Sequence, residues 1–129
     1  MEIGCDIVKV KDIKRLNKNG RLQERILSSA ELDELLSKCN KRVKGHKYTE
    51  REYSLAGKFA AKEATLKALG FGLGKLPLNA INALHKPSGA PYISIDNATA
   101  KKLDINANCI KISISHTGDY AMAVAVYNK

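Results

Sequence analysis

The segment from about Glu50 to Leu69 constrains the fold most, because its pattern predicts one long helix that other elements must enclose. At about 100° per residue, one side of this helix is apolar and the opposite side carries only small residues. The apolar side holds Leu55, Phe59, Leu66 and Leu69, the small side holds Ala60, Ala61, Ala64 and Ala68, and Lys58 and Thr65 point elsewhere. Gly70 is the expected stop. We therefore expect a central helix, with another backbone close against its alanines.

The segments before the long helix predict a strand and two shorter helices. The strand spans Ile3 to Val10, and Asp12 and Gly20 are the expected N-cap and stop of the helix after it. In "LSSAELDELLSKCN", Ser28 and Glu31 have the spacing of a capping box. The apolar stripe predicted for this second helix consists of Leu32, Leu35, Leu36 and Cys39. The polar and basic "KRVKGHKY" follows as a loop.

After the long helix, the pattern changes to strands separated by turns. Gly72 and Gly74 form a turn, and "NAINALHK" and "APYISI" predict two strands joined through "KPSG". Asn97 is the expected cap of a short helix, "NATAKKL". "CIKISISH" alternates apolar and polar residues, "HTGD" predicts a hairpin turn, and "YAMAVAVY" is the last strand. The order predicts one α+β domain over residues 1–129, with a long central helix packed against an antiparallel sheet.

The composition favours a cytoplasmic protein. No run is long and apolar enough to cross a membrane, and the N-terminus has too short an apolar stretch for a signal peptide. Cys5, Cys39 and Cys109 have neither the spacing of metal ligands nor that of a disulfide framework. We expect all three to be small buried apolar residues.

The net charge of +9 favours an anionic partner. It is concentrated in two stretches, Lys9 to Arg25 and Lys38 to Arg51. The partner could be nucleic acid, an acidic protein or a phosphorylated small molecule, and a merely solvated surface is the simpler alternative. Single-stranded nucleic acid is bound through aromatics interleaved with basic residues, whereas these stretches hold essentially only Tyr48. We therefore expect neither nucleic acid nor a membrane as the partner.

Two carboxylates occupy positions where apolar residues are expected. Glu63 lies at the rim of the Phe59 face, and from the helix alone an ordinary ion pair with Lys67, four residues on, is the favoured interpretation. Asp6 lies inside an apolar strand, where Asp is depleted, unless the strand ends early and Asp6 lies in a turn. Together, Asp6 and Glu63 could share a hard cation, with Mg²⁺ the usual occupant when phosphates complete its shell. His116 ends an apolar alternation, and alone it is more often a hydrogen-bonded structural residue.

Three blocks, "IGCDIVKV", "LAGKFAAKEATLKALGFGLG" and "KISISHTGDYAMAVAV", resemble the signature blocks of holo-acyl-carrier-protein synthase, the small bacterial type of 4′-phosphopantetheinyl transferase. The resemblance covers nearly the whole chain in the family's order and spacing. It implies transfer of phosphopantetheine from coenzyme A to a serine of an acidic acyl carrier protein, with release of adenosine 3′,5′-bisphosphate. It also implies a role in fatty acid biosynthesis and a homotrimer with sites between subunits.

The resemblance also implies roles for particular residues. Asp6 and Glu63 match the Mg²⁺-binding carboxylates, and Lys67 matches the lysine that contacts the reacting phosphates. Either Glu63 or a metal-bound water is then the base for the serine proton. The residues that match coenzyme-binding positions are Lys58, Lys62, Lys67, Gly89, Pro91, Ser115 and His116.

Three positions depart from the family pattern. Asp12 stands where many members carry an arginine that grips the carrier, although Lys11, Lys14 and Arg15 are adjacent. Lys58 replaces a common arginine and loses its bidentate fork. Ala90 replaces a common lysine or arginine, which removes one expected phosphate contact. A relative that binds coenzyme A without transferring from it is the alternative, and the intact Asp6, Glu63 and Lys67 argue against it.

Overall fold

The computed structural model describes residues 1–42, 44–72 and 75–129. Its strands are β1 (Glu2–Lys9), β2 (Ile81–His85), β3 (Pro91–Ile95), β4 (Ile110–Thr117) and β5 (Tyr120–Tyr127). Its helices are α1 (Val10–Leu16), α2 (Arg21–Ile26), α3 (Ser29–Leu36), α4 (Glu50–Leu69) and α5 (Asn97–Leu103), with short 3₁₀ turns η1 (Lys18–Gly20), η2 (Leu78–Ala80) and η3 (Ala107–Cys109). The α+β class and the positions of the long helix and the late strands are confirmed.

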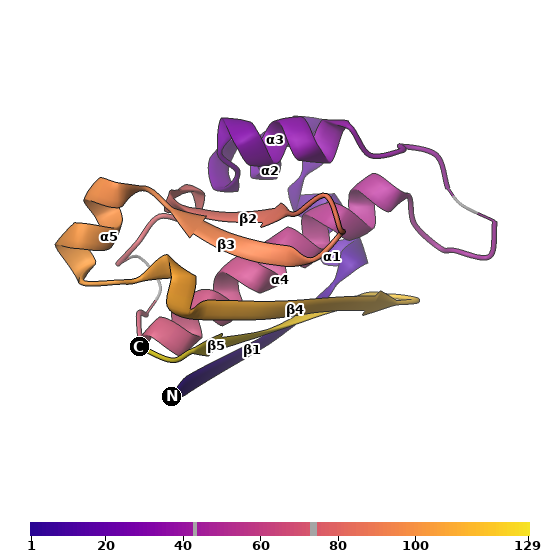
Figure 1. Cartoon of the computed structure of the whole chain (residues 1–129). Coiled ribbons are helices and arrows are strands. Elements are labelled where there is room, and N and C mark those ends of the chain that lie inside the picture. Colours follow the sequence, from indigo (N-terminus) through magenta and orange to yellow (C-terminus); the bar gives the residue numbers. More distant parts are fainter. Residues whose placement is uncertain (43, 73–74) are drawn as a thin grey trace.

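The strands form a three-stranded antiparallel sheet and a separate hairpin. The sheet has the order β1-β5-β4, and the hairpin pairs β2 with β3. Helix α4 packs on the sheet and contacts β2 of the hairpin, β3 lies beside β4, and α3 lies along β2 (Figure 1). The predicted central helix on an antiparallel sheet is therefore confirmed.

The alanine face of α4 brings β1 into close backbone contact. Ala60, Ala61, Ala64 and Ala68 are all buried in one core cluster. A Cβ atom added to Gly4 of β1 would lie 2.0 Å from the carbonyl oxygen of Ala64 and 2.7 Å from the amide nitrogen of Ala68. Only a glycine fits there, so Gly4 sets how closely β1 and its next inward residue, Asp6, approach α4.

Several predicted helix ends are wrong by a few residues. Val10 begins α1 instead of ending β1, and Lys9 is its N-cap without a side-chain hydrogen bond. Asp12 therefore lies inside the first turn and does not cap it, and α1 ends at Leu16, four residues before Gly20. Asp96, not Asn97, caps α5, by accepting a hydrogen bond from the amide of Thr99 at 2.9 Å. The predicted turn residue Gly74 lies outside the described residues.

Some expectations about burial are also wrong. The capping box of Ser28 and Glu31 is confirmed, but Leu36 and Cys39 are exposed because Glu31 and Leu35 occupy the buried face of α3. Cys5 is exposed because it alternates with the inward-facing Gly4 and Asp6, and Cys109 is only half-buried. Lys58 and Thr65, predicted to point away from both packed faces, are fully enclosed. Among the described residues, no helix has the length and hydropathy needed to cross a membrane.

Candidate functional site

The two predicted carboxylates meet where β1 crosses α4. Asp6 lies within β1, so the alternative that it occupies a turn is wrong. The ammonium of Lys67, on α4, lies 3.1 Å from Oδ1 of Asp6 and 2.8 Å from the carbonyl oxygen of Cys5. Lys67 is thus paired with the strand, and the ordinary helix-edge pair of Lys67 with Glu63 does not form.

The electrostatics of this carboxylate pair fit a hard cation. Burial, followed by the charge of Asp6, raises the pKa of Glu63 above its ordinary value, while Lys67 opposes the shift. Oδ2 of Asp6 is buried and has no hydrogen-bond partner in the described parts of the chain. A buried carboxylate oxygen without a partner, beside a second carboxylate, is costly unless a cation offsets the charge.

The donor set is small but suits magnesium. Within residues 1–42, 44–72 and 75–129, no group of three or more His, Cys, Asp and Glu side chains is arranged to hold a metal. Mg²⁺ differs from most metals in that one or two carboxylates are enough, since waters and substrate phosphates complete its octahedron. Asp6 and Glu63 therefore fit a magnesium ion that is held jointly with a phosphorylated substrate.

A cavity of about 380 Å³ opens beside the first half of α4. It brings together four of the residues predicted to bind coenzyme: Lys58, Gly89, Pro91 and His116. The remaining lining residues are Lys38, His46, Tyr48, Glu50, Tyr53, Ser54, Gly57, His85 and Ile114. Cationic and aromatic groups predominate, so the cavity suits a ligand with anionic groups and a flat ring.

His116 is held by an aromatic partner. Its ring stacks on that of Tyr53, with centroids 4.3 Å apart and 22° between the planes. The hydroxyl of Tyr53 donates to the carbonyl oxygen of Gly118 at 2.5 Å, which ties the β4–β5 turn to α4. Burial, with a contribution from the charge of His46, lowers the pKa of His116. His116 is therefore a largely neutral, oriented ring on the cavity wall at neutral pH.

Two residues predicted to bind coenzyme, Lys62 and Ser115, do not line this cavity. Lys62 is completely buried, and its ammonium contacts Glu31 at 2.6 Å and the carbonyl oxygens of Ile26, Leu78 and Ile81. With its donors all occupied, Lys62 is a structural residue, and this expectation is corrected. Ser115 lies on the other face of β4 from His116, because side chains alternate along a strand, and it does not line the cavity.

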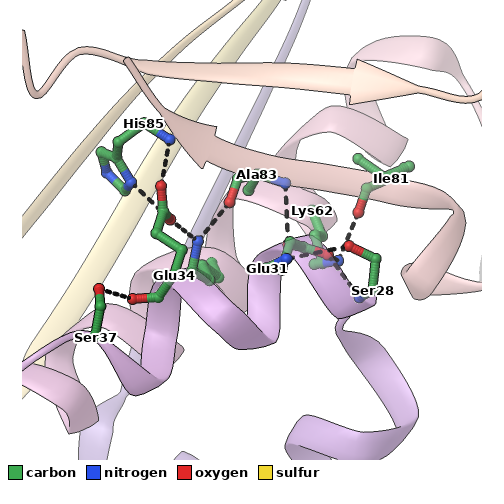
Figure 2. Close-up of polar contacts among 9 residues, drawn as sticks. Ser28, Glu31, Glu34, Ser37, Lys62, Ile81, Ala83 and His85 are labelled. Carbon is green, nitrogen blue, oxygen red and sulfur yellow. Dashed lines mark hydrogen bonds and ion pairs between the residues drawn. The ribbon is translucent and has the colours of Figure 1, made fainter. Parts of the chain in front are cut away.

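Sequence reasoning missed the acidic residues of α3 and the aromatic partner of His116. Glu31 and Glu34 are spaced one helical turn apart, as are Lys58 and Lys62 on α4. In the structure, Glu31 pairs with Lys62 (Figure 2). Glu34 pairs with Lys58. The matching spacing was a usable signal, whereas nothing in the sequence brings Tyr53 to His116.

The carboxylate pair and the cavity lie on opposite sides of α4. Lys58 and Lys67 are nine residues apart, which is a rotation of about 180° around the helix. Lys58 faces the cavity, Lys67 faces β1, and Gly57 packs against Ile114 of β4 between them. A single chain thus presents two half-sites separated by its central helix.

Comparisons with known proteins agree with this architecture. A family model described as ACPS, 4′-phosphopantetheinyl transferase superfamily, matches residues 2–125. A holo-[acyl-carrier-protein] synthase of Alkaliphilus metalliredigens is 39% identical over 96% of this chain and 95% of its own. The crystal structure of the synthase from Neisseria meningitidis superposes with a TM-score of 0.81 at 34% identity, covering 99% of this chain and 98% of that one.

A second structure adds a ligand. The Helicobacter pylori synthase, solved in complex with coenzyme A, has a TM-score of 0.78 and 32% identity, covering 98% of this chain and 99% of that one. The family model thus matches almost the entire chain, and relatives above 30% identity cover nearly its full length. The chain belongs to the ACPS family of the 4′-phosphopantetheinyl transferase superfamily.

Proposed function

We propose that this protein transfers the 4′-phosphopantetheine group of coenzyme A to a serine of an apo-acyl carrier protein, releasing adenosine 3′,5′-bisphosphate. The observation that carries the proposal is the meeting of Asp6, Glu63 and Lys67 at the β1–α4 crossing, in a chain of this family. The holo-carrier product would serve fatty acid biosynthesis, and we extend the proposal to a cytoplasmic location.

We propose that Asp6 and Glu63 hold Mg²⁺. When bound, this ion would neutralise phosphate oxygens of coenzyme A and stabilise the charge that develops on the leaving group. Lys67 is held by Asp6 and the carbonyl oxygen of Cys5, so its ammonium stays beside the carboxylates in the absence of substrate. In that position it can donate to a phosphate oxygen with little reorganisation.

The serine hydroxyl must lose its proton as it attacks phosphorus. Of the two carboxylates, Glu63 is the better placed to accept this proton, because Asp6 is paired with Lys67 and Glu63 is not. We assign the proton to Glu63 for this reason. The cavity beside Lys58 and His116 would hold the nucleotide end of coenzyme A, where its cations and rings suit phosphates and adenine.

We propose that the enzyme is a homotrimer in which the cavity of one subunit adjoins the carboxylate pair of the next. Two observations support this. The half-sites lie on opposite sides of α4, so one chain does not present both to one ligand directly. The outer face of the sheet also exposes Ile3 and Ile7, at 70% and 62%, beside Met122, Val124 and Val126 of β5. A contiguous apolar sheet face of this kind is typical of a subunit interface.

Mass spectrometry of an apo-acyl carrier protein, incubated with coenzyme A and Mg²⁺, tests the activity. We expect the carrier to gain the mass of phosphopantetheine, and Asp6→Asn and Glu63→Gln to nearly abolish the gain while the fold is retained. Asp33→Asn is the matched control, because Asp33 is an exposed carboxylate on α3. Near-wild-type turnover by Asp6→Asn or Glu63→Gln at limiting Mg²⁺ would show that the metal assignment is wrong.

Mixing a variant of the cavity with a variant of the carboxylate pair tests the assembly, once each variant alone has been shown to transfer little phosphopantetheine. His116→Ala removes a residue of the cavity, and Glu63→Gln removes a residue of the carboxylate pair. Every site of either homotrimer therefore lacks one of these two residues. If the site lies between subunits, exchange of subunits creates some sites with both residues intact, and activity returns. A mixture that stays inactive after verified exchange, or a fully active monomer, would place the whole site within one chain.

A further inference from the structure

Helix α3 is joined to α4 and β2 by two similar sets of polar contacts. Glu31 accepts hydrogen bonds from Lys62 at 2.6 Å and from the backbone amide of Ala83 at 3.0 Å. One turn further along, Glu34 accepts from Lys58. It also accepts from the backbone amide of His85 at 2.7 Å (Figure 2). The spacing of one turn on α3 and α4, and of two residues on β2, makes the two sets correspond.

The second set differs because it reaches the cavity. Lys58 and His85 both line that cavity, whereas Glu31 and Lys62 are buried completely. Nδ1 of His85 lies 3.1 Å from Oε2 of Glu34, a contact that has no counterpart at Ala83. Burial of Glu34 opposes its ionisation, but the hydrogen bonds from Lys58 and His85 outweigh this effect and lower the pKa of Glu34. Glu34 is therefore a carboxylate with two basic partners.

The imidazole of His85 adds little to the cross-link between α3 and β2. The backbone amide of His85 already makes that link, as the amide of Ala83 does one turn away. The side chain is 28% exposed, and among the described residues no hydrogen bond is found to its Nε2. A carboxylate at Nδ1 favours the tautomer or the charged form in which Nδ1 carries a proton, and it fixes the orientation of the ring.

We propose that His85, oriented by Glu34, is a further ligand-binding residue of this cavity and that it contacts a phosphate group of the bound nucleotide through Nε2. This inference rests on the proposed function, because coenzyme A supplies the phosphates. In the imidazolium form both nitrogens donate, so His85 holds Glu34 through one and the phosphate through the other. Glu34 is the positioning residue, and His85 is the residue that touches the ligand.

The charged and titratable groups around His85 come from several elements. Glu34 faces it from α3, Lys58 and Glu50 line the same cavity from α4, and Lys38 follows α3. His46 and His116 line the cavity as well, and Lys86 is the next residue in the chain. Lys58 already holds Glu34 and the carbonyl oxygen of Ala83, at 2.6 Å for the latter, which leaves one of its three donors free. The imidazolium form of His85 would give a phosphate a second donor, and histidine side chains adopt this form more at pH 6 than at pH 8.

Calorimetric titration with coenzyme A at pH 6 and pH 8 tests the proposal. His85→Gln keeps one N–H donor but cannot be protonated. We expect its Kd to exceed that of the wild type by about tenfold at pH 6 and by about twofold at pH 8, since a hydrogen bond to a charged partner is the stronger kind. Titration of the phosphate and of His46 and His116 affects both proteins alike and cancels in the ratio. Lys86→Gln, which changes an exposed neighbouring charge, is the matched control and should match the wild type.

Steady-state kinetics separate binding from structure. The KM of His85→Gln for coenzyme A should rise at pH 6 with kcat unchanged, because the contact is made equally in the ground and transition states. The Kd of Glu34→Gln for coenzyme A should also depend less on pH than the Kd of the wild type does. Repeating the titration with 3′-dephospho-coenzyme A identifies the phosphate: loss of the His85 effect assigns it to the 3′-phosphate, and persistence assigns it to the pyrophosphate.

Equal affinities of wild type and His85→Gln at both pH values would overturn the proposal and leave the proposed function intact. Failure of the wild type to bind coenzyme A at all would instead overturn the proposed function. If His85→Gln does not fold, proton NMR of the wild type decides, because the pKa of His85 must rise when adenosine 3′,5′-bisphosphate is added. An unchanged His85 pKa in the saturated protein would equally count against the contact.

Discussion

Replacing Lys62 with methionine should destabilise the fold severely, although Lys62 precedes a proposed metal ligand and was expected to bind the coenzyme. Its ammonium is the common donor to Glu31 and to three carbonyl oxygens at 2.5–2.9 Å, which belong to α2, η2 and β2. Lys62→Met leaves the Glu31 carboxylate buried without its cation. Removing one partner of a buried ion pair typically costs about 3–5 kcal/mol.

The size of the chain converts this cost into a melting temperature. An unfolding entropy of about 2.1 cal/mol/K per residue, over 129 residues, means that each kcal/mol shifts Tm by about 4 °C. Lys62→Met should therefore melt about 12–20 °C below the wild type by circular dichroism. The protomer concentration must be held fixed, because the stability of an oligomer depends on it.

A double variant separates the isolated charge from the loss of packing. In Lys62→Met/Glu31→Leu neither charge remains, so the double variant should be more stable than Lys62→Met alone despite carrying one more substitution. Glu31→Gln cannot replace Glu31→Leu in this experiment. Three donors point at the two carboxylate oxygens of Glu31, so the amide nitrogen of a glutamine would face at least one donor. A Lys62→Met protein that melts within about 3 °C of the wild type would refute the reasoning, because it would mean that water or another cation reaches Glu31.

The pH dependence of stability gives an independent check on Lys62. Burial lowers the pKa of Lys62 to about 8, although the charge of Glu31 opposes the shift. Between that value and the ordinary lysine pKa of about 10.4, the unfolded chain binds more protons than the folded one. The contribution of Lys62 to the free energy of unfolding should therefore rise with pH across this window. The rise should be present in urea titrations of the wild type and absent from those of Lys62→Met.

Three further predictions concern the site and its surroundings. Gly4→Ala should destabilise the fold by about 1–3 kcal/mol and lower kcat/KM, because the added Cβ would clash with the backbone of α4 and displace Asp6. Unchanged kinetics of this variant would contradict the close approach of β1 to α4. Because burial and Asp6 raise the pKa of Glu63, the Kd for Mg²⁺ measured by calorimetry should rise as pH falls through that pKa, and Glu63→Gln should lack this dependence. The double variant Lys14→Glu/Arg15→Glu should raise the KM for the carrier protein, mainly at low salt, and leave the affinity for coenzyme A unchanged. Asp12→Arg should lower the KM for the carrier protein. It should reduce the free energy of unfolding by only about 0.5 kcal/mol, because Asp12 is not a cap. An unchanged carrier KM in the double variant would direct attention to the stretch from Lys38 to Arg51.

The central helix could be predicted because its determinants are local. The capping box of α4, the alanine spacing and the stop at Gly70 all lie within 22 residues that the helical period orders by itself. The contact of Asp6 with α4 could be inferred for a related reason, since a carboxylate in an apolar strand requires a partner. Short-range signals of this kind specify where an element lies and which of its residues are unusual.

The buried polar contacts could not be predicted, because they depend on elements far apart in the chain. Lys58 and Lys62 are charged residues in a helix pattern, and charged residues are almost always exposed unless paired. Their partners Glu31 and Glu34 lie on another helix, and only the packing of α3 over β2 brings the four together. The errors at α1 and α5 have a simpler origin, since an acidic residue near a helix start can cap it or lie in its first turn with similar benefit.

The departures at Lys58 and Ala90 become intelligible when they are considered with Glu34 and His85. Lys58 is enclosed by Glu34 and a backbone carbonyl, a space that satisfies a compact ammonium but would leave several of the five donors of an arginine without acceptors. Glu34 offsets the charge of Lys58, so the cavity needs another cation for a phosphate. Ala90 does not supply one, but His85 pairs with the adjacent Pro91 across the β2–β3 hairpin and lines the cavity with it. A basic group missing from the turn before β3 is thus present at the end of β2. On this reasoning Ala90→Lys should restore coenzyme A affinity to His85→Gln at pH 6, where the expected loss is about tenfold, and should help the wild type least at that pH. Equal gains from Ala90→Lys in both backgrounds at both pH values would mean that positions 85 and 90 serve different groups of the ligand.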